Sequence, residues 1–220
     1  MSHSHTHSQQ QQQTTVFFGG SNGTKTLLAL LGDKSNNDNV NHTLRVVTRK
    51  PDNFLNTATT TTSNNNNGEI QRWRCNEQVH ISNTLSASFL PTQWITHEGQ
   101  PDSVFSYDDD DIDAAISGSL SNNVVGDNGG QADVLLLCCP VYAHLDILRK
   151  IARSLYRLDS QMNLSKKRPL LIGTVYSAGG FDWMCRLAFH LEKPQNKNSN
   201  NSNNSNQNLL FQGWQNFELG

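Results

Sequence analysis

The stretch Val16-Phe-Phe-Gly-Gly-Ser-Asn-Gly-Thr-Lys-Thr-Leu-Leu-Ala-Leu-Leu31 decides the fold of this 220-residue chain. A short run of β-forming residues meets two glycines, and a leucine-rich helical patch follows at 26–31. A glycine-bearing turn between a strand and a helix directs the unpaired N–H groups of the helix N-terminus toward a possible anion. The stretch therefore predicts the first βα unit of an α/β fold.

Strand and helix signals continue to alternate along the rest of the chain. The predicted elements are strands at 44–48, 134–138 and 169–174, and helices at 144–158 and 184–191. The run Val134–Cys138 is continuously apolar, as in a strand that is covered on both faces. Two β-like pieces, Val79–Ile81 and Trp94–Thr96, lie in a stretch whose pattern does not order them. The alternation predicts a single α/β domain with a doubly wound, mostly parallel, Rossmann-like sheet.

Polar tracts of Asn, Gln, Thr and Ser interrupt this pattern and bury too little apolar surface to offset the entropy of ordering them. We expect a disordered tail at 1–14, a folded domain at 15–194 with low-complexity inserts near 56–67 and 117–131, and an Asn-rich linker within 195–220. The acidic run Asp108–Asp111 is interpreted as a solvated loop, because the glycine and distal glutamate of a calcium loop are absent.

Charge and composition exclude several classes of function. There are 17 Lys+Arg and 19 Asp+Glu, and this near-neutral balance gives no electrostatic case for nucleic acid or an anionic membrane. No apolar run is long enough to span a bilayer, and the N-terminus lacks the pattern of a secretory signal. Four cysteines in apolar contexts indicate a reducing compartment, so we expect a cytoplasmic protein. Because Cys138 and Cys139 are adjacent on a strand and point to opposite faces, no metal site is predicted there or elsewhere.

The glycine loop suits a phosphate, and three interpretations compete. The first is a dinucleotide fingerprint that starts at Gly19, with Ser21 and Thr24 at the second and third glycine positions. The second is a P-loop ending in Lys25-Thr26, in which Thr24 replaces the glycine before the lysine. The third is an ordinary glycine-rich turn. Under the first interpretation the loop residues that bind the cofactor are Gly19, Gly20, Ser21, Asn22, Gly23 and Thr24.

The end of the second strand, Thr48-Arg49-Lys50, bears on which cofactor is preferred. Enzymes that prefer NAD place a carboxylate there for the ribose 2′-hydroxyl, whereas cations neutralise a 2′-phosphate. Arg49 and Lys50 therefore favour NADP over NAD, although NAD stays possible; the alternative is a solvated basic turn before Pro51.

Four segments, in this order, resemble the N-terminal half of the opine dehydrogenases (octopine/nopaline type), relatives of the glycerol-3-phosphate dehydrogenase and ketopantoate reductase-like enzymes. They are Phe17-Phe-Gly-Gly-Ser-Asn-Gly23, Leu44-Arg-Val-Val-Thr-Arg-Lys-Pro51, Ala132-Asp-Val-Leu-Leu-Leu-Cys-Cys-Pro-Val-Tyr-Ala-His144 and Ile172-Gly-Thr-Val-Tyr-Ser-Ala-Gly-Gly-Phe-Asp-Trp183. In that family an Asn-Gly pair lies in the nucleotide loop and an apolar strand ends in Pro-x-x-Ala-His.

The resemblance implies an NAD(P)-dependent oxidoreductase that condenses an amino acid with a 2-oxo acid, hydride passing from the nicotinamide to an imine carbon. It also implies a catalytic C-terminal domain after residue 195, of which this chain holds only the start. The open alternatives are a non-catalytic dinucleotide-binding module and a P-loop nucleotide hydrolase.

Further site residues follow from position and from the resemblance. Cys139, Pro140 and Val141 follow a central strand, so we expect them near the cofactor. The resemblance places Tyr176, Ser177 and Gly179 beside the substrate. The catalytic residues are unknown. His144, at a helix start, is a candidate donor to a cofactor or substrate carboxylate, and the alternative is local packing.

Overall fold

The computed structural model describes residues 13–33, 42–55, 70–80, 92–118, 130–162, 169–176 and 179–194. Its main sheet has five parallel strands, in the spatial order β5 (Ser103–Ser106), β2 (His42–Thr48), β1 (Gln13–Phe18), β6 (Val134–Leu137) and β7 (Leu171–Thr174). The two halves of the sheet grow outward from the central pair, β1 and β6. This order is Rossmann-like and confirms the predicted doubly wound α/β fold.

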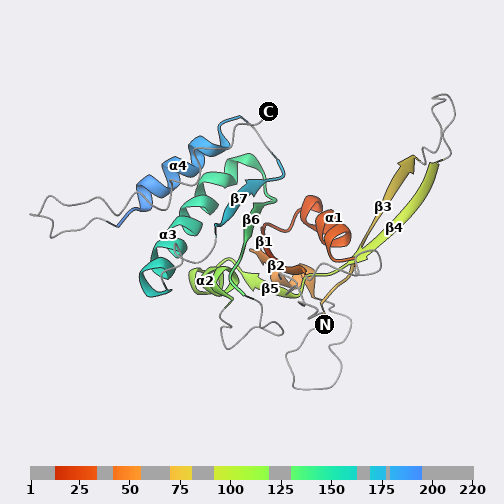
Figure 1. Ribbon diagram of the computed structural model, residues 1–220, viewed down its shortest axis with the longest axis horizontal. Coiled ribbons are helices and arrows are strands. Elements are labelled where there is room, and N and C mark those ends of the chain that lie inside the picture. The colour runs from red at the N-terminus through yellow and green to blue at the C-terminus, as the bar shows by residue number, and fades with distance from the viewer. Residues whose placement is uncertain are drawn as a thin grey trace, which may run out of the picture.

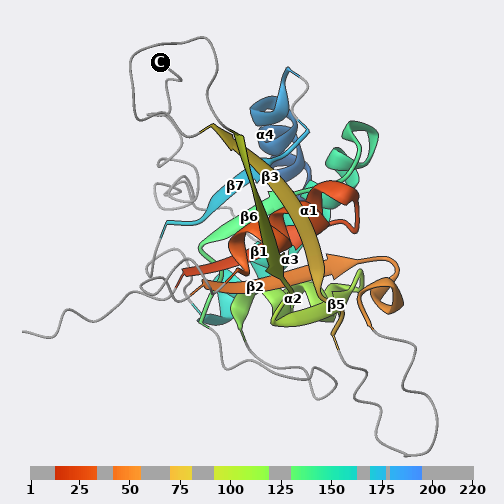
Figure 2. The same ribbon diagram turned by 90° about the vertical axis from the view of Figure 1, so that its right-hand side faces the viewer.

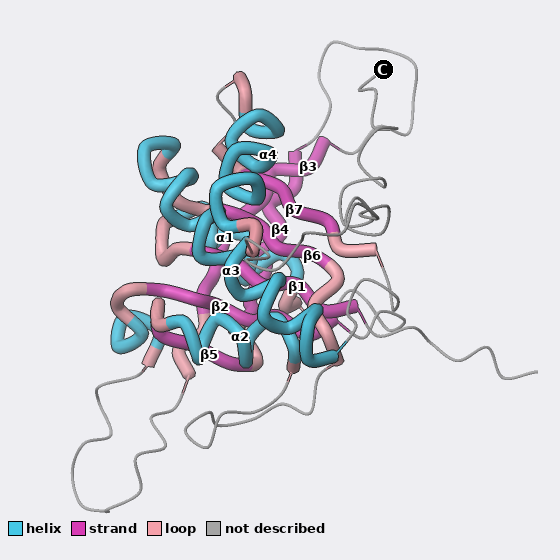
Figure 3. Tube along the Cα trace, turned by 90° about the vertical axis from the view of Figure 1, so that its left-hand side faces the viewer, coloured by secondary structure: helices cyan, strands magenta, loops and turns pink. Residues whose placement is uncertain are grey.

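Different elements cover the two faces of the sheet. One face carries α1 (Asn22–Leu31) and the antiparallel hairpin of β3 (Trp73–His80) and β4 (Thr92–Gly99), as Figures 1 and 2 show. The other face carries α2 (Asp109–Ser117), α3 (His144–Met162) and α4 (Phe181–Glu192), which lie on the near side in Figure 3. Two short 3-10 turns, η1 (Pro51–Phe54) and η3 (Val141–Ala143), follow β2 and β6. Within the described ranges, every helix is too short or too polar to cross a membrane.

Each central strand contributes side chains to both cores, which explains why it is apolar throughout. Val16 and Phe18 of β1 lie in the core beneath α2, α3 and α4, whereas Phe17 lies in the smaller core beneath α1. After β6 the alternation continues, with Cys138 in the α1 core and Cys139 in the opposite core. The prediction that these two thiols point to opposite faces is therefore confirmed.

Two polar segments that the sequence analysis placed outside the strands and helices form part of them. The strand β1 begins at Gln13, two residues before the predicted domain start, because the buried Thr14 donates its N–H to Asp133 (2.9 Å) while β1 pairs with β2. The prediction that the acidic run Asp108–Asp111 forms a loop is wrong in part. Asp109–Ser117 forms α2, and Asp111 accepts the N–H of Ser106 at 2.9 Å. Residues 1–12, 56–69, 119–129 and 195–220, which hold most of the predicted tail, inserts and linker, lie outside the described residues.

The hairpin of β3 and β4 stands in the connection from β2 to β5, where a doubly wound sheet usually has a helix. It is joined to the C-terminal end of α1 by His97, whose ring nitrogens each lie 3.1 Å from a carboxylate, Asp33 on one side and Glu77 on the other. Two glycines allow the backbones to touch. A Cβ on Gly99 would lie 2.1 Å from the carbonyl oxygen of Leu28 and 2.9 Å from the backbone of Gly32.

We expect Gly99→Ala to destabilise the protein by about 3 kcal/mol, because the added methyl group meets rigid backbone. Gly179→Ala is the matched control, since a Cβ there has no described atom within 4 Å. Urea unfolding of the two variants measures the difference. Equal midpoints would show that the hairpin does not depend on this contact.

Candidate functional site

The candidate site lies at the carboxyl edge of the sheet, between the loops that follow β1 and β6. The chain leaves β1 toward α1 on one face and leaves β6 toward α3 on the other face. In doubly wound sheets, ligands bind outside the strand ends at the point where the winding reverses. This is the place where the sequence predicted a cofactor.

Gly19 fixes the turn after β1. Its φ of 119° is a conformation that favours glycine, and a Cβ would lie 2.9 Å from the carbonyl oxygen of Cys138. Its N–H donates to Val47 on the neighbouring strand (2.9 Å). The turn is therefore held between the ends of β2 and β6, and it delivers the chain directly into α1.

The two departures from the glycine fingerprint are both used to hold this turn. The Ser21 hydroxyl donates to the carbonyl of Cys138 at 2.6 Å, and the buried Thr24 donates to the carbonyl of Gly19 at 2.8 Å. Ser21 is the N-cap of α1, and its side chain donates away from the helix instead of capping it. In the first turn of α1, all of which is described, there is no carboxylate. Within this turn, therefore, no carboxylate competes with an anion for the N–H groups of Asn22, Gly23 and Thr24.

Tyr176, from the segment after β7, lies over the start of α1. A Cβ on Gly23 would lie 2.8 Å from its hydroxyl oxygen, so the glycine allows the phenol to approach the helix closely. The side chain is 41% exposed and its hydroxyl is the far end of a rotatable group. Gly179 is exposed nearby in sequence, at the entry to α4, and Ser177 lies outside the described residues. Tyr176 is therefore the predicted substrate residue that the structure brings to the glycine loop.

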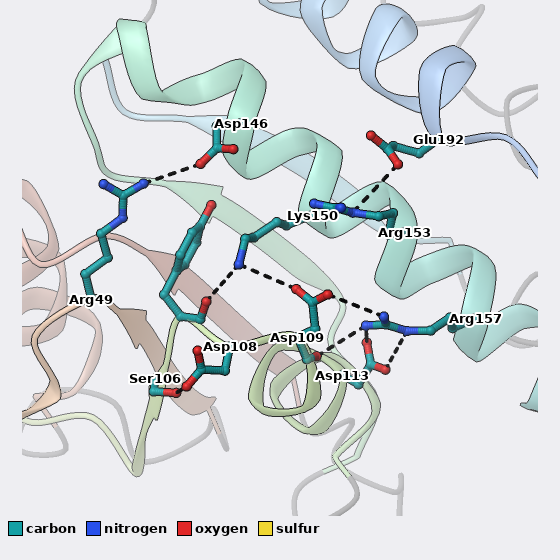
Figure 4. A network of polar contacts seen from close by, with 11 residues as sticks. Arg49, Ser106, Asp108, Asp109, Asp113, Asp146, Lys150, Arg153, Arg157 and Glu192 are labelled. Atoms are coloured by element: carbon teal, nitrogen blue, oxygen red, sulfur yellow. Dashed lines mark hydrogen bonds and ion pairs between the residues drawn. The ribbon is translucent and has the colours of Figure 1, made fainter.

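The basic turn after β2 lies beside the acidic end of α3. Arg49 is exposed, lies 3.3 Å from the carboxylate of Asp146, and stacks over the ring of Tyr107 at 5.2 Å from its centroid (Figure 4). Lys150 covers the same ring at 4.4 Å. An exposed ion pair of this kind contributes only about 0–1 kcal/mol, so Arg49 is available to a stronger anion. Thr48 is buried under the turn, where its Oγ1 accepts the N–H of Lys50 (3.3 Å).

Three side chains beside the loop were missed by sequence reasoning. Tyr107 and Asp146 flank Arg49, and Trp73 flanks Lys25. Tyr107 follows β5, a strand that was not recognised because it has only four residues, Ser103–Ser106. The signal in the sequence that could have predicted β5 was the alternation of polar and apolar residues at Ser103–Ser106, followed by the aromatic Tyr107.

The residues that follow β6 at the carboxyl edge of the sheet include two that are buried and two that are exposed. Pro140 and Val141 are exposed, whereas Cys138 and Cys139 are buried, and burial raises the pKa of their thiols to about 12 and about 11. Both thiols are neutral at physiological pH, so neither adds a negative charge beside a bound anion.

His144 lies inside the protein. Its ring is fully buried, Nε2 lies 3.0 Å from the carbonyl of Cys139, and the ring packs edge-on against Phe181. The hydrogen bond requires the proton on Nε2. This arrangement matches the alternative of local packing, and we do not assign His144 a catalytic role.

Lys25 points away from the place where a P-loop lysine would act. Its ammonium lies 4.1 Å from the centre of the Trp73 ring, on the hairpin that covers α1. The contact favours a dinucleotide loop over a P-loop, in which the lysine must reach the terminal phosphates.

A network of ion pairs joins the three helices on the opposite face of the sheet (Figure 4). Arg157 binds the carboxylate of Asp113 through Nε and Nη2 at 3.0 and 2.9 Å, and Glu192 of α4 pairs with Arg149 and Arg153 of α3. The bidentate Arg157 pair holds α3 against α2. The network therefore keeps the N-terminal end of α3, and with it Asp146, beside the basic turn.

A scan against protein-family models and a search of the curated proteins found no match for this chain.

Proposed function

We propose that this protein binds NADP(H) at the carboxyl edge of its sheet and forms the nucleotide-binding part of an NADP-dependent oxidoreductase. The observation that carries the proposal is the glycine turn at the reversal point of a Rossmann-like sheet, where Gly19 has no room for a side chain. Such a turn opening a helix suits a diphosphate, because backbone N–H groups and the helix dipole both favour negative charge there.

The surrounding residues fit the parts of that cofactor. The amides that open α1 would hold the diphosphate, and Gly19 and Gly20 let the turn that presents them pass close to Cys138 and Phe54. Arg49 would neutralise the 2′-phosphate that distinguishes NADP from NAD, and Tyr107 offers an aromatic surface beside it. Pro140 and Val141 would border the nicotinamide half. When bound, NADP(H) supplies or accepts a hydride.

The reaction that we propose is the reductive joining of an amino acid and a 2-oxo acid. Its support is the motif resemblance described above, and the position of Tyr176 beside Gly23 of the glycine loop agrees with a substrate beside the nicotinamide. Four free thiols, three of them buried, agree with a cytoplasmic location.

A second candidate is a dinucleotide-binding module without catalysis of its own. The buried state of His144 favours it, because this residue was the acid–base candidate that the sequence offered. The two candidates share the binding site and differ only in turnover.

Cofactor preference tests the binding site. We expect NADPH to bind more tightly than NADH, and ATP to bind most weakly. Arg49→Ala should weaken NADPH binding about tenfold while changing NADH binding little, since a charge-assisted hydrogen bond contributes about 1.5 kcal/mol. Asp146→Asn should tighten NADPH binding, because it removes the carboxylate that competes for Arg49. Titration calorimetry measures all of these affinities.

Arg186→Ala is the matched control, because Arg186 is also an exposed arginine paired with an aspartate, Asp182, at 3.9 Å. A preference for NADH that survives Arg49→Ala would contradict the role given to Arg49, and absent binding of either nucleotide would remove the proposed function.

Tyr176 generates a separate prediction, because its hydroxyl lies against Gly23 in the first turn of α1, where the proposed diphosphate would also lie. If the ring rests there about nine-tenths of the time, the apparent affinity for NADPH is reduced about tenfold. We therefore expect Tyr176→Ala to tighten binding by up to about tenfold, and Tyr176→Phe, which keeps the ring, to have a smaller effect. Weaker binding by Tyr176→Ala would show instead that the side chain holds the bound cofactor.

Turnover separates the two candidates. Purified protein with NADPH, pyruvate and each amino acid in turn is followed by the loss of NADPH absorbance. An oxidoreductase consumes NADPH only when both co-substrates are present, and Gly19→Ala abolishes this by obstructing the turn. Tight NADPH binding without consumption under any pairing identifies the non-catalytic module.

A further inference from the structure

The register of β2 and β5 brings together the residues that follow these two strands. The strands are parallel neighbours, and Thr48, the last residue of β2, pairs with Ser106, the last residue of β5. Arg49 and Tyr107 are therefore the next residues of the two strands at the carboxyl edge of the sheet, and the guanidinium of Arg49 lies 5.2 Å from the centre of the Tyr107 ring. The strand pairing thus puts an aromatic side chain beside the cation that we propose for the 2′-phosphate.

The hydroxyl group of Tyr107 is buried and has no hydrogen-bond partner in the part of the chain that the structure describes. The great majority of buried polar groups in proteins are paired, because an unpaired one loses its hydration without compensation. Burial first, and then the nearby carboxylate of Asp146, raise the pKa of the phenol far above its ordinary value. The hydroxyl group therefore keeps its proton at physiological pH and is a donor that lacks an acceptor.

The surroundings of this donor favour an acceptor that is an anion. Besides Arg49, the ammonium of Lys150 lies over the Tyr107 ring, 4.4 Å from its centroid. The charges of Arg49 and Arg153 both act on the phenol, and both lower its pKa against the larger effect of burial. Lys150 also donates to the backbone carbonyl of Tyr107 at 3.0 Å, which ties this residue to α3. The donor is therefore held in place from two elements, among cations.

The carboxylate of Asp146 does not supply that acceptor. It pairs with Arg49 at 3.3 Å (Figure 4), and it makes no hydrogen bond to the Tyr107 hydroxyl. The side chains of Arg49 and Asp146 are 71% and 58% exposed, so separating them costs little. A 2′-phosphate carries nearly two negative charges at neutral pH and has three acceptor oxygens. It can therefore accept from Arg49 through one oxygen and from Tyr107 through another.

We infer that the hydroxyl group of Tyr107 donates a hydrogen bond to the 2′-phosphate of NADP(H), once Arg49 has turned from Asp146 to the phosphate. The inference rests on the proposed function, because it assigns a second protein group to the same anion. Arg49 supplies charge on a long, exposed side chain, whereas Tyr107 supplies a donor whose backbone is fixed by β5 and by Lys150. Two residues on neighbouring strands then distinguish NADP from NAD, rather than one arginine.

Adenosine 2′,5′-bisphosphate and adenosine 5′-monophosphate, which differ only in the 2′-phosphate, test the inference on the full chain. Tyr107→Phe removes the hydroxyl and keeps the ring beside Arg49. By titration calorimetry we expect it to weaken binding of the bisphosphate about tenfold, as for one hydrogen bond to an ionised group, and to leave the monophosphate unchanged. Tyr156→Phe is the matched control, because this partly buried hydroxyl donates to the carbonyl of Phe189 (3.1 Å), and it should change neither affinity.

A measurement on the unaltered protein covers a Tyr107→Phe variant that does not fold. We expect NMR to show a tyrosine hydroxyl proton that exchanges slowly with water when the bisphosphate is bound and rapidly when the monophosphate is bound. Equal affinity of the unaltered protein and Tyr107→Phe for the bisphosphate, or the same hydroxyl exchange with both nucleotides, would overturn the inference and leave the proposed function standing. If neither the bisphosphate nor NADPH binds the unaltered protein, the proposed function fails and the inference fails with it.

Discussion

The structure depends on a close contact between the backbones of two strand ends. Gly19 lies so near the carbonyl of Cys138 that any side chain would overlap it, and this contact joins the turn after β1 to the end of β6. Because the two strands are the central pair of the sheet, the contact sets where α1 starts relative to both halves of the fold. The direction of the helix N–H groups, and so the place of any anion, follows from it.

The hydroxyl groups of Ser21 and Thr24 show how a sequence can depart from a glycine fingerprint and keep its geometry. A second glycine lets a diphosphate approach, and a third lets helix and strand pack closely. Here Ser21 turns its side chain onto the Cys138 carbonyl, and Thr24 satisfies the Gly19 carbonyl from inside the helix. Both hydroxyl groups thus bond to backbone carbonyls of the segments that follow β1 and β6, and so hold the turn in place.

The sequence predicted the parallel framework well because its strands are buried on both faces and its helices have one apolar side. Val134–Cys138 and His144–Leu158 are such segments, and both match β6 and α3 closely. Elements stabilised by tertiary contacts were harder to predict. The polar strand β3 is held by pairing with β4 and by packing on α1, and α2 looked like a loop because its first turn is all aspartate.

The residues of the candidate site likewise fall into those that a local sequence pattern predicts and those that only tertiary contacts reveal. Gly19 to Thr24 were predicted as cofactor residues because loop chemistry is local, and Arg49 was predicted because it follows a recognisable strand. Asp146 was not, because its meeting with Arg49 joins residues 97 positions apart. Local patterns therefore predict candidate ligand-binding groups, whereas a side chain that competes with the ligand for Arg49, such as Asp146, is recognised only in three dimensions.

Under the proposed function, the contact between Arg49 and Asp146 would make nucleotide preference depend on the helical layer as well as on the turn after β2. The Arg49–Asp146 pair is exposed on both sides and therefore weak, so a phosphate that carries nearly two negative charges at neutral pH can displace the carboxylate. The strength of the competitor depends on where α3 holds Asp146. That position depends on the pairs that α3 makes with its neighbours: Arg157 with Asp113 of α2, about three helical turns from Asp146, and Arg149 and Arg153 with Glu192 of α4. If the proposed site binds NADP(H), a change in how these helices pack would alter the preference between NADP and NAD without altering any residue proposed to contact the nucleotide.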